Sequence, residues 1–195
     1  MWLLDLLGLP PGASFGFTTG CQAAHVTALA VARHELLRRR GVDVERAGLA
    51  GSPRLRVLAA GDRHITVDLA LRYLGIGTDA LTVLPSDEQG RVHPEVFHEA
   101  LATDDSAPTI VLAQAGNIHT GAFEDFVRIS SIAHQADAWV HVDGASGCQQ
   151  ANRCGTLQRA WMGRIPGQPM RTKCSTRRMT ADSWPVHRRR PTGLQ

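Results

Sequence analysis

The 195 residues of the chain, 43% of them hydrophobic, suffice for one good-sized globular domain or for part of a larger one. The four cysteines form no C-x-x-C pair, which argues against a zinc site and a disulfide framework; the apolar stretch 2–8 has no basic leader and is interrupted by Asp5, which argues against a signal peptide or a membrane span. The net charge of +3 is unevenly distributed along the chain. Residues 1–147 carry 11 Lys/Arg and 17 Asp/Glu, whereas residues 148–195 carry 10 Lys/Arg and 1 Asp/Glu. We expect a cytoplasmic enzyme or enzyme fragment with a basic tail.

Helical and strand patterns alternate along residues 2–147. Helices are expected at 2–7, 21–40, 64–74, 94–101 and 124–134, and continuous apolar strands at 54–60, 80–85, 109–115 and 138–142. Strands that are apolar throughout and alternate with helices indicate a mostly parallel sheet with flanking helices. The sequence therefore predicts an α/β fold.

The alternating pattern stops after Gly147. Residues 148–195 show neither helical nor strand periodicity and contain four of the ten prolines, so we predict a domain over 1–147 and a basic irregular tail over 148–195. One interpretation of the tail is a coding sequence read out of frame in a GC-rich gene, which agrees with one lysine against twenty arginines. The other is a nucleic-acid-binding segment, which a short Arg-rich run without a folded platform supports poorly.

A small-residue turn, Thr19-Gly20-Cys21-Gln22, precedes the predicted helix 21–40. Free backbone N–H groups and the helix dipole favour an anion such as phosphate at this place. Because small-residue loops are common before helices, the turn alone is a weak signal for phosphate, and an ordinary helix start is the simpler interpretation.

A single carboxylate, Asp143, ends the last predicted strand and is followed by the small residues Gly144, Ala145 and Gly147. An acid at the carboxyl end of such a strand lies where open α/β sheets bind ligands, and the small residues would leave space for something flat. The alternative is an Asp that caps the following helix.

Four blocks, in order and spacing, resemble the group II pyridoxal-phosphate-dependent amino-acid decarboxylases, which include the aromatic-amino-acid, glutamate and histidine decarboxylases. The blocks are residues 2–33, His64, residues 113–126 (AQAGNIHTGAFEDF) and residues 139–147 (WVHVDGASG). The resemblance implies part of the large domain of the aspartate aminotransferase-like, fold type I pyridoxal-phosphate (PLP) enzymes. It implies a carboxy-lyase that releases CO₂ from an L-amino acid through an external aldimine, and a homodimer for the full-length family.

The resemblance also assigns roles position by position. It implies that Gly20, Cys21 and Gln22 hold the cofactor phosphate and that Ala145 packs beside the ring. His64 would stack on the pyridine ring and assist proton transfer, although a helix-start histidine bonded to backbone is the simpler interpretation. Asn117 falls near the ring where many relatives have threonine. Asp143 would pair with the pyridine nitrogen and keep it protonated, which makes the ring an electron sink; His64 and Asp143 are the expected catalytic residues.

The departures from the family pattern concern His25 and the lysine. Asparagine is commoner at the position of His25, which we expect to lie one helical step beyond the cofactor contact. The His-Lys pair that supplies the Schiff-base lysine is missing: Lys173 is the only lysine, in unrelated surroundings, and the run 181–184, which resembles the segment before that pair, leads to no lysine. Lys173 is therefore not assigned as catalytic, and the chain alone is expected to be inactive.

Two other functions stay open. One is a different fold type I PLP enzyme, an aminotransferase or an aldol-cleaving lyase, which product analysis would separate from CO₂ release. The other is a non-catalytic remnant with an anion-binding tail, which salt-dependent retention on DNA would reveal. His93 and His98 lack metal-ligand spacing, so no metal is expected. The sequence names no particular amino acid as substrate.

Overall fold

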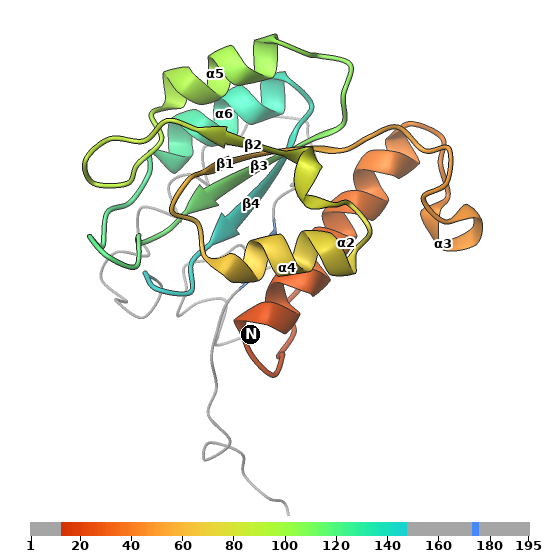
Figure 1. Cartoon of the computed structure of the whole chain (residues 1–195), viewed down its shortest axis with the longest axis horizontal. Helices are drawn as coiled ribbons and strands as arrows, with labels where there is room; N and C mark the ends of the chain where they lie inside the picture. The colour runs from red at the N-terminus through yellow and green to blue at the C-terminus, as the bar shows by residue number, and fades with distance from the viewer. Residues whose placement is uncertain (1–12, 148–172, 176–195) are drawn as a thin grey trace, which may run out of the picture.

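The computed structural model describes residues 13–147 and 173–175, which contain a five-stranded parallel sheet (Figure 1). The strands lie in the order β2-β1-β3-β4-β5, and every neighbouring pair is parallel. Their bounds are β1 Arg56–Ala60, β2 Leu81–Leu84, β3 Thr109–Gln114, β4 Trp139–Asp143 and β5 Lys173–Ser175. The predicted parallel α/β fold is confirmed.

Helices cover both faces of this sheet. On one side lie α2 (Cys21–Arg39) and α4 (Ile65–Tyr73), and on the other lie α5 (Pro94–Ala102) and α6 (Phe126–Gln135) (Figure 1). Short helices, α3 (Val44–Ala47) and η1 (Thr78–Ala80), occupy connections. The carboxyl ends of the parallel strands β1, β3 and β4 lie at the same edge of the sheet, so the segments that follow these strands meet there.

Successive residues of the strands contribute alternately to two hydrophobic cores, one on each face of the sheet. In β1, Val57 and Ala59 belong to the core beneath α2 and α4, while Leu58 and Ala60 belong to the core beneath α5 and α6. The fully buried strand β3 divides its residues in the same way. Since successive side chains point to opposite faces, a sheet covered on both sides requires apolar residues at every position.

The expected elements agree with the observed ones to within one or two residues at most ends. The long helix ends at Arg39, with Arg38 and Arg39 in its last turn and Gly41 at φ 78°, as cations followed by glycine predict. The expected helix at 2–7 lies outside the described residues. Neither α3 nor η1 was predicted.

One short strand, β5, lies within the predicted tail. Lys173–Ser175 pair in parallel with His141–Asp143; the other tail residues lie outside the described ones, and the division at Gly147 stays a prediction. Within residues 13–147 and 173–175, no helix has the length and apolar character needed to cross a membrane.

Candidate functional site

The first turn of α2 presents backbone donors at the carboxyl edge of the sheet. Gly20 precedes the helix with a φ of 154°, and no side chain of the described residues caps the helix start. The first turn contains no acidic residue, so its N–H groups and the helix dipole are available to an anion. The structure thus places Gly20, Cys21 and Gln22 at a helix start, as predicted.

The start of α4 lies beside that turn. Gln22 Nε2 donates to the carbonyl of Thr66 at 3.3 Å, which joins the first turns of the two helices. His64 caps α4: its Nδ1 accepts from the Thr66 backbone N–H at 3.3 Å and lies 2.8 Å from Thr66 Oγ1. Accepting at Nδ1 leaves the proton of the neutral ring on Nε2. The simpler interpretation, a histidine bonded to backbone, therefore describes the contacts of His64, whose ring is exposed.

Asp143 ends β4 at the same edge. Its Oδ1 accepts from the Ala145 backbone N–H at 3.1 Å, and its side chain is only 12% exposed. Burial by itself would raise the pKa of Asp143, but the imidazole of His25 and the Ala145 amide outweigh it, so the pKa lies below its ordinary value. The residue is an ionised carboxylate with a fixed orientation, which is what a cationic ring nitrogen requires.

Two buried histidines stand behind Asp143, and sequence reasoning missed both. His25 Nε2 lies 3.4 Å from Asp143 Oδ2, and His25 Nδ1 lies 3.0 Å from His141 Nε2. His25 is 2% exposed and His141 is not exposed at all. His25 lies one helical turn beyond Cys21 on α2, where its ring reaches β4 and contacts Asp143, a contact that the sequence did not predict. The alternation of β4, which puts His141 and Asp143 on one face, was the signal that could have found them.

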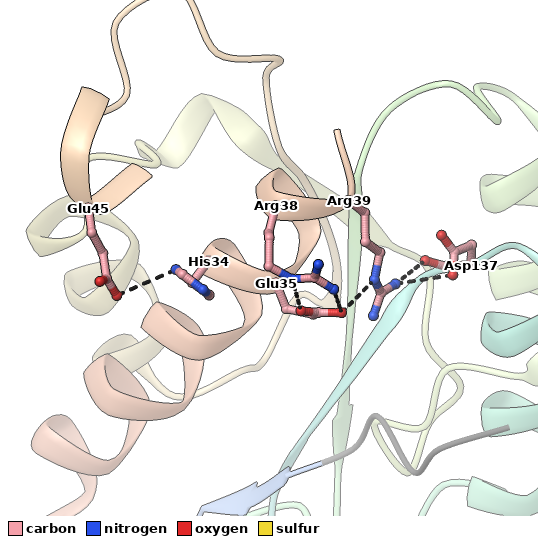
Figure 2. A network of polar contacts seen from close by, with 6 residues as sticks. All are labelled: His34, Glu35, Arg38, Arg39, Glu45 and Asp137. Atoms are coloured by element: carbon pink, nitrogen blue, oxygen red, sulfur yellow. Dashed lines mark hydrogen bonds and ion pairs between the residues drawn. The ribbon is translucent and has the colours of Figure 1, made fainter. Parts of the chain in front are cut away.

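The same helix is held at its other end. Arg39 Nη1 donates to the backbone carbonyl of Asp137 at 3.2 Å and to its Oδ1 at 3.1 Å (Figure 2). Glu35 accepts from Arg38 and Arg39, and the pKa of Glu35 falls to about 2, chiefly because of the Arg38 hydrogen bond. Since Asp137 precedes β4 and Asp143 ends it, α2 runs antiparallel to β4, and its N-terminus points at the site.

Asn117 follows β3 and is buried. Its Oδ1 accepts from the backbone N–H groups of His119 and Thr120, and its Nδ2 donates to Asp62 in the segment after β1. Thus both ends of the amide already have protein partners. These contacts hold together the segments that follow β1 and β3, and the place of Asn117 near a cofactor ring stays a prediction.

Gly147 does not leave space for a ligand, contrary to expectation. A Cβ at Gly147 would lie 2.0 Å from the Ala115 carbonyl oxygen and 2.7 Å from Phe123. Gly116, at φ 93°, lies against the Gly147 backbone in turn. The absence of a side chain lets the turn after β4 pack on the segment after β3. Ala145, half-buried, stays beside Asp143.

The fold and this edge define a class: parallel α/β domains that bind a ligand beyond the carboxyl ends of their strands, between helix N-termini and a buried carboxylate. Solved structures narrow the class to fold type I PLP enzymes. The Oryza sativa TDC with PLP and tryptamine is 28% identical with a TM-score of 0.67, over 83% of this chain and 34% of that one. The glutamate decarboxylase domain of a Vibrio parahaemolyticus enzyme is 25% identical with a TM-score of 0.73, over 82% and 36%.

The chain belongs to the pyridoxal-dependent decarboxylase family, whose conserved-domain model matches residues 1–166. The human acidic amino acid decarboxylase GADL1 is 28% identical over 148 residues, or 74% of this chain and 27% of the relative. The aromatic-L-amino-acid decarboxylase of Bacillus atrophaeus is 30% identical over 149 residues, or 75% and 29%. The chain therefore spans less than a third of the length of these relatives.

Proposed function

We propose that this chain is the cofactor-binding part of a PLP-dependent amino-acid decarboxylase, a carboxy-lyase that releases CO₂ from an L-amino acid. The observation that carries the proposal is the meeting of three groups at one sheet edge. The uncapped first turn of α2, His64 at the start of α4 and the ionised Asp143 are linked through the Gln22–Thr66 and His25–Asp143 contacts.

These residues fit the cofactor. A doubly charged phosphate suits the first turn of α2, because free N–H groups and the positive helix end lie there without a competing acid. A Cβ at Gly20 would meet no atom of the described residues within 4 Å, so the backbone can approach a ligand closely. Asp143 accepts one described donor on Oδ1 and one on Oδ2, and each oxygen keeps a lone pair for a ring N–H.

When bound, PLP supplies an electron sink for the pair released as the bond to the carboxylate carbon breaks. The chain's own residues prepare that chemistry. Gly20, Cys21 and Gln22 anchor the phosphate, and Asp143 holds a proton on the ring nitrogen by staying ionised. His64 offers a flat ring with an Nε2–H, and Ala145 keeps the neighbouring side chain small. Asn117 supports the edge by fixing the loop after β3 to Asp62.

The chain lacks the His-Lys pair that supplies the Schiff-base lysine in the family it resembles. Lys173 is the only lysine of the chain and lies on β5. It pairs in register with His141 of β4, which is two positions before Asp143. The sequence around it differs from the family pair, and we propose that it forms no covalent bond with the cofactor, so that turnover is absent. Borohydride reduction in the presence of PLP, followed by peptide mass spectrometry, tests this: a pyridoxyl group on Lys173 would overturn it.

Binding itself is tested with the 195-residue chain. PLP titration followed by fluorescence should give saturable binding, and Asp143→Asn should weaken it about 10- to 100-fold, since charge-assisted hydrogen bonds contribute about 1.5–3 kcal/mol. Asp105→Asn is the matched control, because Asp105 is an exposed carboxylate in the connection between α5 and β3. It should leave the affinity unchanged. Equal affinities for the two variants would exclude Asp143 as the ring partner.

Further parts of the proposal concern the whole protein. We propose a homodimer. Phe15 and Phe17 support it, because their ring centroids lie 5.9 Å apart in an edge-to-face contact while the residues stay 52% and 59% exposed; light scattering measures the oligomeric state.

A cytoplasmic location, which cell fractionation tests, and the division at Gly147 into domain and tail are predictions too. The family match extends to residue 166, so sequencing the gene across codons 147–166 tests the frameshift hypothesis.

A further inference from the structure

We propose that His25 and His141 are positioning residues that form a buried, uncharged hydrogen-bond relay, His141 to His25 to Asp143, which orients the carboxylate at the candidate site. The inference deepens the proposed function and rests on it only for the identity of the ligand that Asp143 meets. The relay itself belongs to the chain without cofactor.

The geometry joins three side chains from two elements. His25 comes from α2, and His141 and Asp143 come from β4, two residues apart on one face. The two rings lie 3.0 Å apart between nitrogens, with their centroids 5.2 Å apart. The free nitrogen of His25 then faces Asp143 Oδ2 at 3.4 Å, long for a hydrogen bond but close enough for a polar contact that fixes the carboxylate plane.

The protons can be placed by exclusion. Complete burial lowers the pKa of His141 to about 3, so the His141 ring is neutral and carries one N–H. Its Nδ1 is buried and has no hydrogen-bond partner among the described residues. An N–H at that place would be an orphaned donor, which costs about 1–3 kcal/mol, whereas buried acceptors lacking a partner are better tolerated. The proton of His141 therefore belongs on Nε2, from which it donates to His25 Nδ1.

The remaining proton follows from the first. Because His25 Nδ1 accepts from His141, the neutral His25 ring carries its proton on Nε2 and donates it towards Asp143 Oδ2. The carboxylate then receives His25 on one oxygen and the Ala145 amide on the other. Rotation of the carboxylate would lose both donors, so its remaining lone pairs keep a fixed direction.

The direct test is the tautomeric state of the rings in the cofactor-free, full-length chain. Long-range ¹H–¹⁵N spectra of ¹⁵N-histidine-labelled protein at pH 7.5 should show His25 and His141 as neutral Nε2–H tautomers, and His25→Asn and His141→Gln assign the two signals. Exposed His98 should show the averaged tautomers of a free ring. A doubly protonated His25, an Nδ1–H on His141, or averaged pH-sensitive tautomers at either ring would overturn the relay.

Variants test whether the relay positions Asp143. His141→Phe removes the donor to His25, whereas His141→Gln keeps an amide donor near the same place. The ¹³C-carboxyl titration of Asp143 should move upward by about one pH unit in His25→Asn and His141→Phe, return towards wild type in His141→Gln, and stay unchanged in His98→Gln. An unshifted Asp143 in His25→Asn overturns the positioning role. PLP affinity is measured separately, so a relay that forms in a chain unable to bind PLP would refute the proposed function and leave this inference standing.

Discussion

Arg39 donates through one nitrogen, Nη1, to both the carbonyl and the carboxylate of Asp137, and so joins the last turn of α2 to the residue two positions before β4 (Figure 2). Asp137 is the one non-glycine residue with positive φ, 51°, in the described part of the chain. Such a backbone conformation is unfavourable outside glycine and persists only when neighbouring contacts support it. The arginine supplies that support while its side chain is 11% exposed.

Replacing Arg39 by alanine should destabilise the fold by about 1–2 kcal/mol, because the largely buried guanidinium and its charge-assisted hydrogen bonds to Glu35 and Asp137 are removed. Urea unfolding followed by circular dichroism measures the change. Arg38→Ala is the matched control: Arg38 is 60% exposed and, among the described residues, pairs with Glu35, so its loss should cost clearly less than the loss of Arg39. Equal losses would mean that the Asp137 contact contributes nothing.

His64 caps α4, and substitutions can separate this cap from the cofactor contact that we propose for its ring. Asparagine is a good helix cap but has no ring, whereas phenylalanine keeps a flat ring without an acceptor. We expect His64→Asn to keep the stability and weaken PLP binding, and His64→Phe to lose about 1 kcal/mol of stability and largely keep the binding. Thermal unfolding and PLP titration on the same samples check both. If His64→Asn binds PLP as wild type does, the ring makes no contact with the cofactor.

Glu124 should make stability fall with rising pH. The buried carboxylate accepts from the backbone N–H groups of Val92 and Gln114, yet burial, aided by the charges of Asp62 and Asp87, raises its pKa from 4.5 to about 7. The folded state thus keeps a proton that the unfolded chain releases between pH 4.5 and 7. Its contribution is fully present below pH 4.5 and is lost, by about 3 kcal/mol, as the pH rises through 7.

Urea unfolding of wild type and Glu124→Gln at pH 5 and pH 8 checks the Glu124 prediction. The glutamine variant cannot titrate, so the difference between the two pH values should shrink. Glu99→Gln, an exposed glutamate on α5, should keep the wild-type difference. An unchanged pH dependence in Glu124→Gln would show that the carboxylate is ionised throughout.

Gly147 should tolerate no side chain. Alanine there would place Cβ 2.0 Å from the Ala115 carbonyl oxygen, and since backbone cannot move aside cheaply, we expect a loss of about 1–3 kcal/mol. Gly16→Ala, where a Cβ meets nothing within 4 Å, is the control and should be near neutral. A stable Gly147→Ala would mean that the turn after β4 is free to rearrange.

The sequence was sufficient for the architecture because its strands are mostly apolar and its helices carry end signals. Cations and glycine after Arg39 marked one helix end, and Pro94 marked a helix start. The strand β5 could not be predicted, since three residues from a polar, proline-rich segment carry no periodicity. Its pairing with β4 depends on tertiary contact rather than on local preference.

The site was predicted in part. Residues at element ends, such as Gly20, His64 and Asp143, could be placed because parallel strands deliver them to one edge. The His25–His141 contact joins residues 116 apart in the chain, which no local pattern reveals. Asn117 and Gly147 were expected to face a ligand, yet their contacts are with Asp62 and Ala115, because small loops at a crowded edge satisfy one another first.

The antiparallel placement of α2 on β4 has a consequence for which lengths this segment can tolerate. From His25 to Arg39 the helix rises about 21 Å, and from Asp137 to Asp143 the strand covers about 20 Å. The two lengths match, so the Arg39–Asp137 and His25–Asp143 contacts can form together. One residue inserted into α2 would rotate everything beyond it by about 100°, and either Arg39 or His25 would then face away from its partner. Natural length variation should therefore fall in the connections on either side of this helix and not within it.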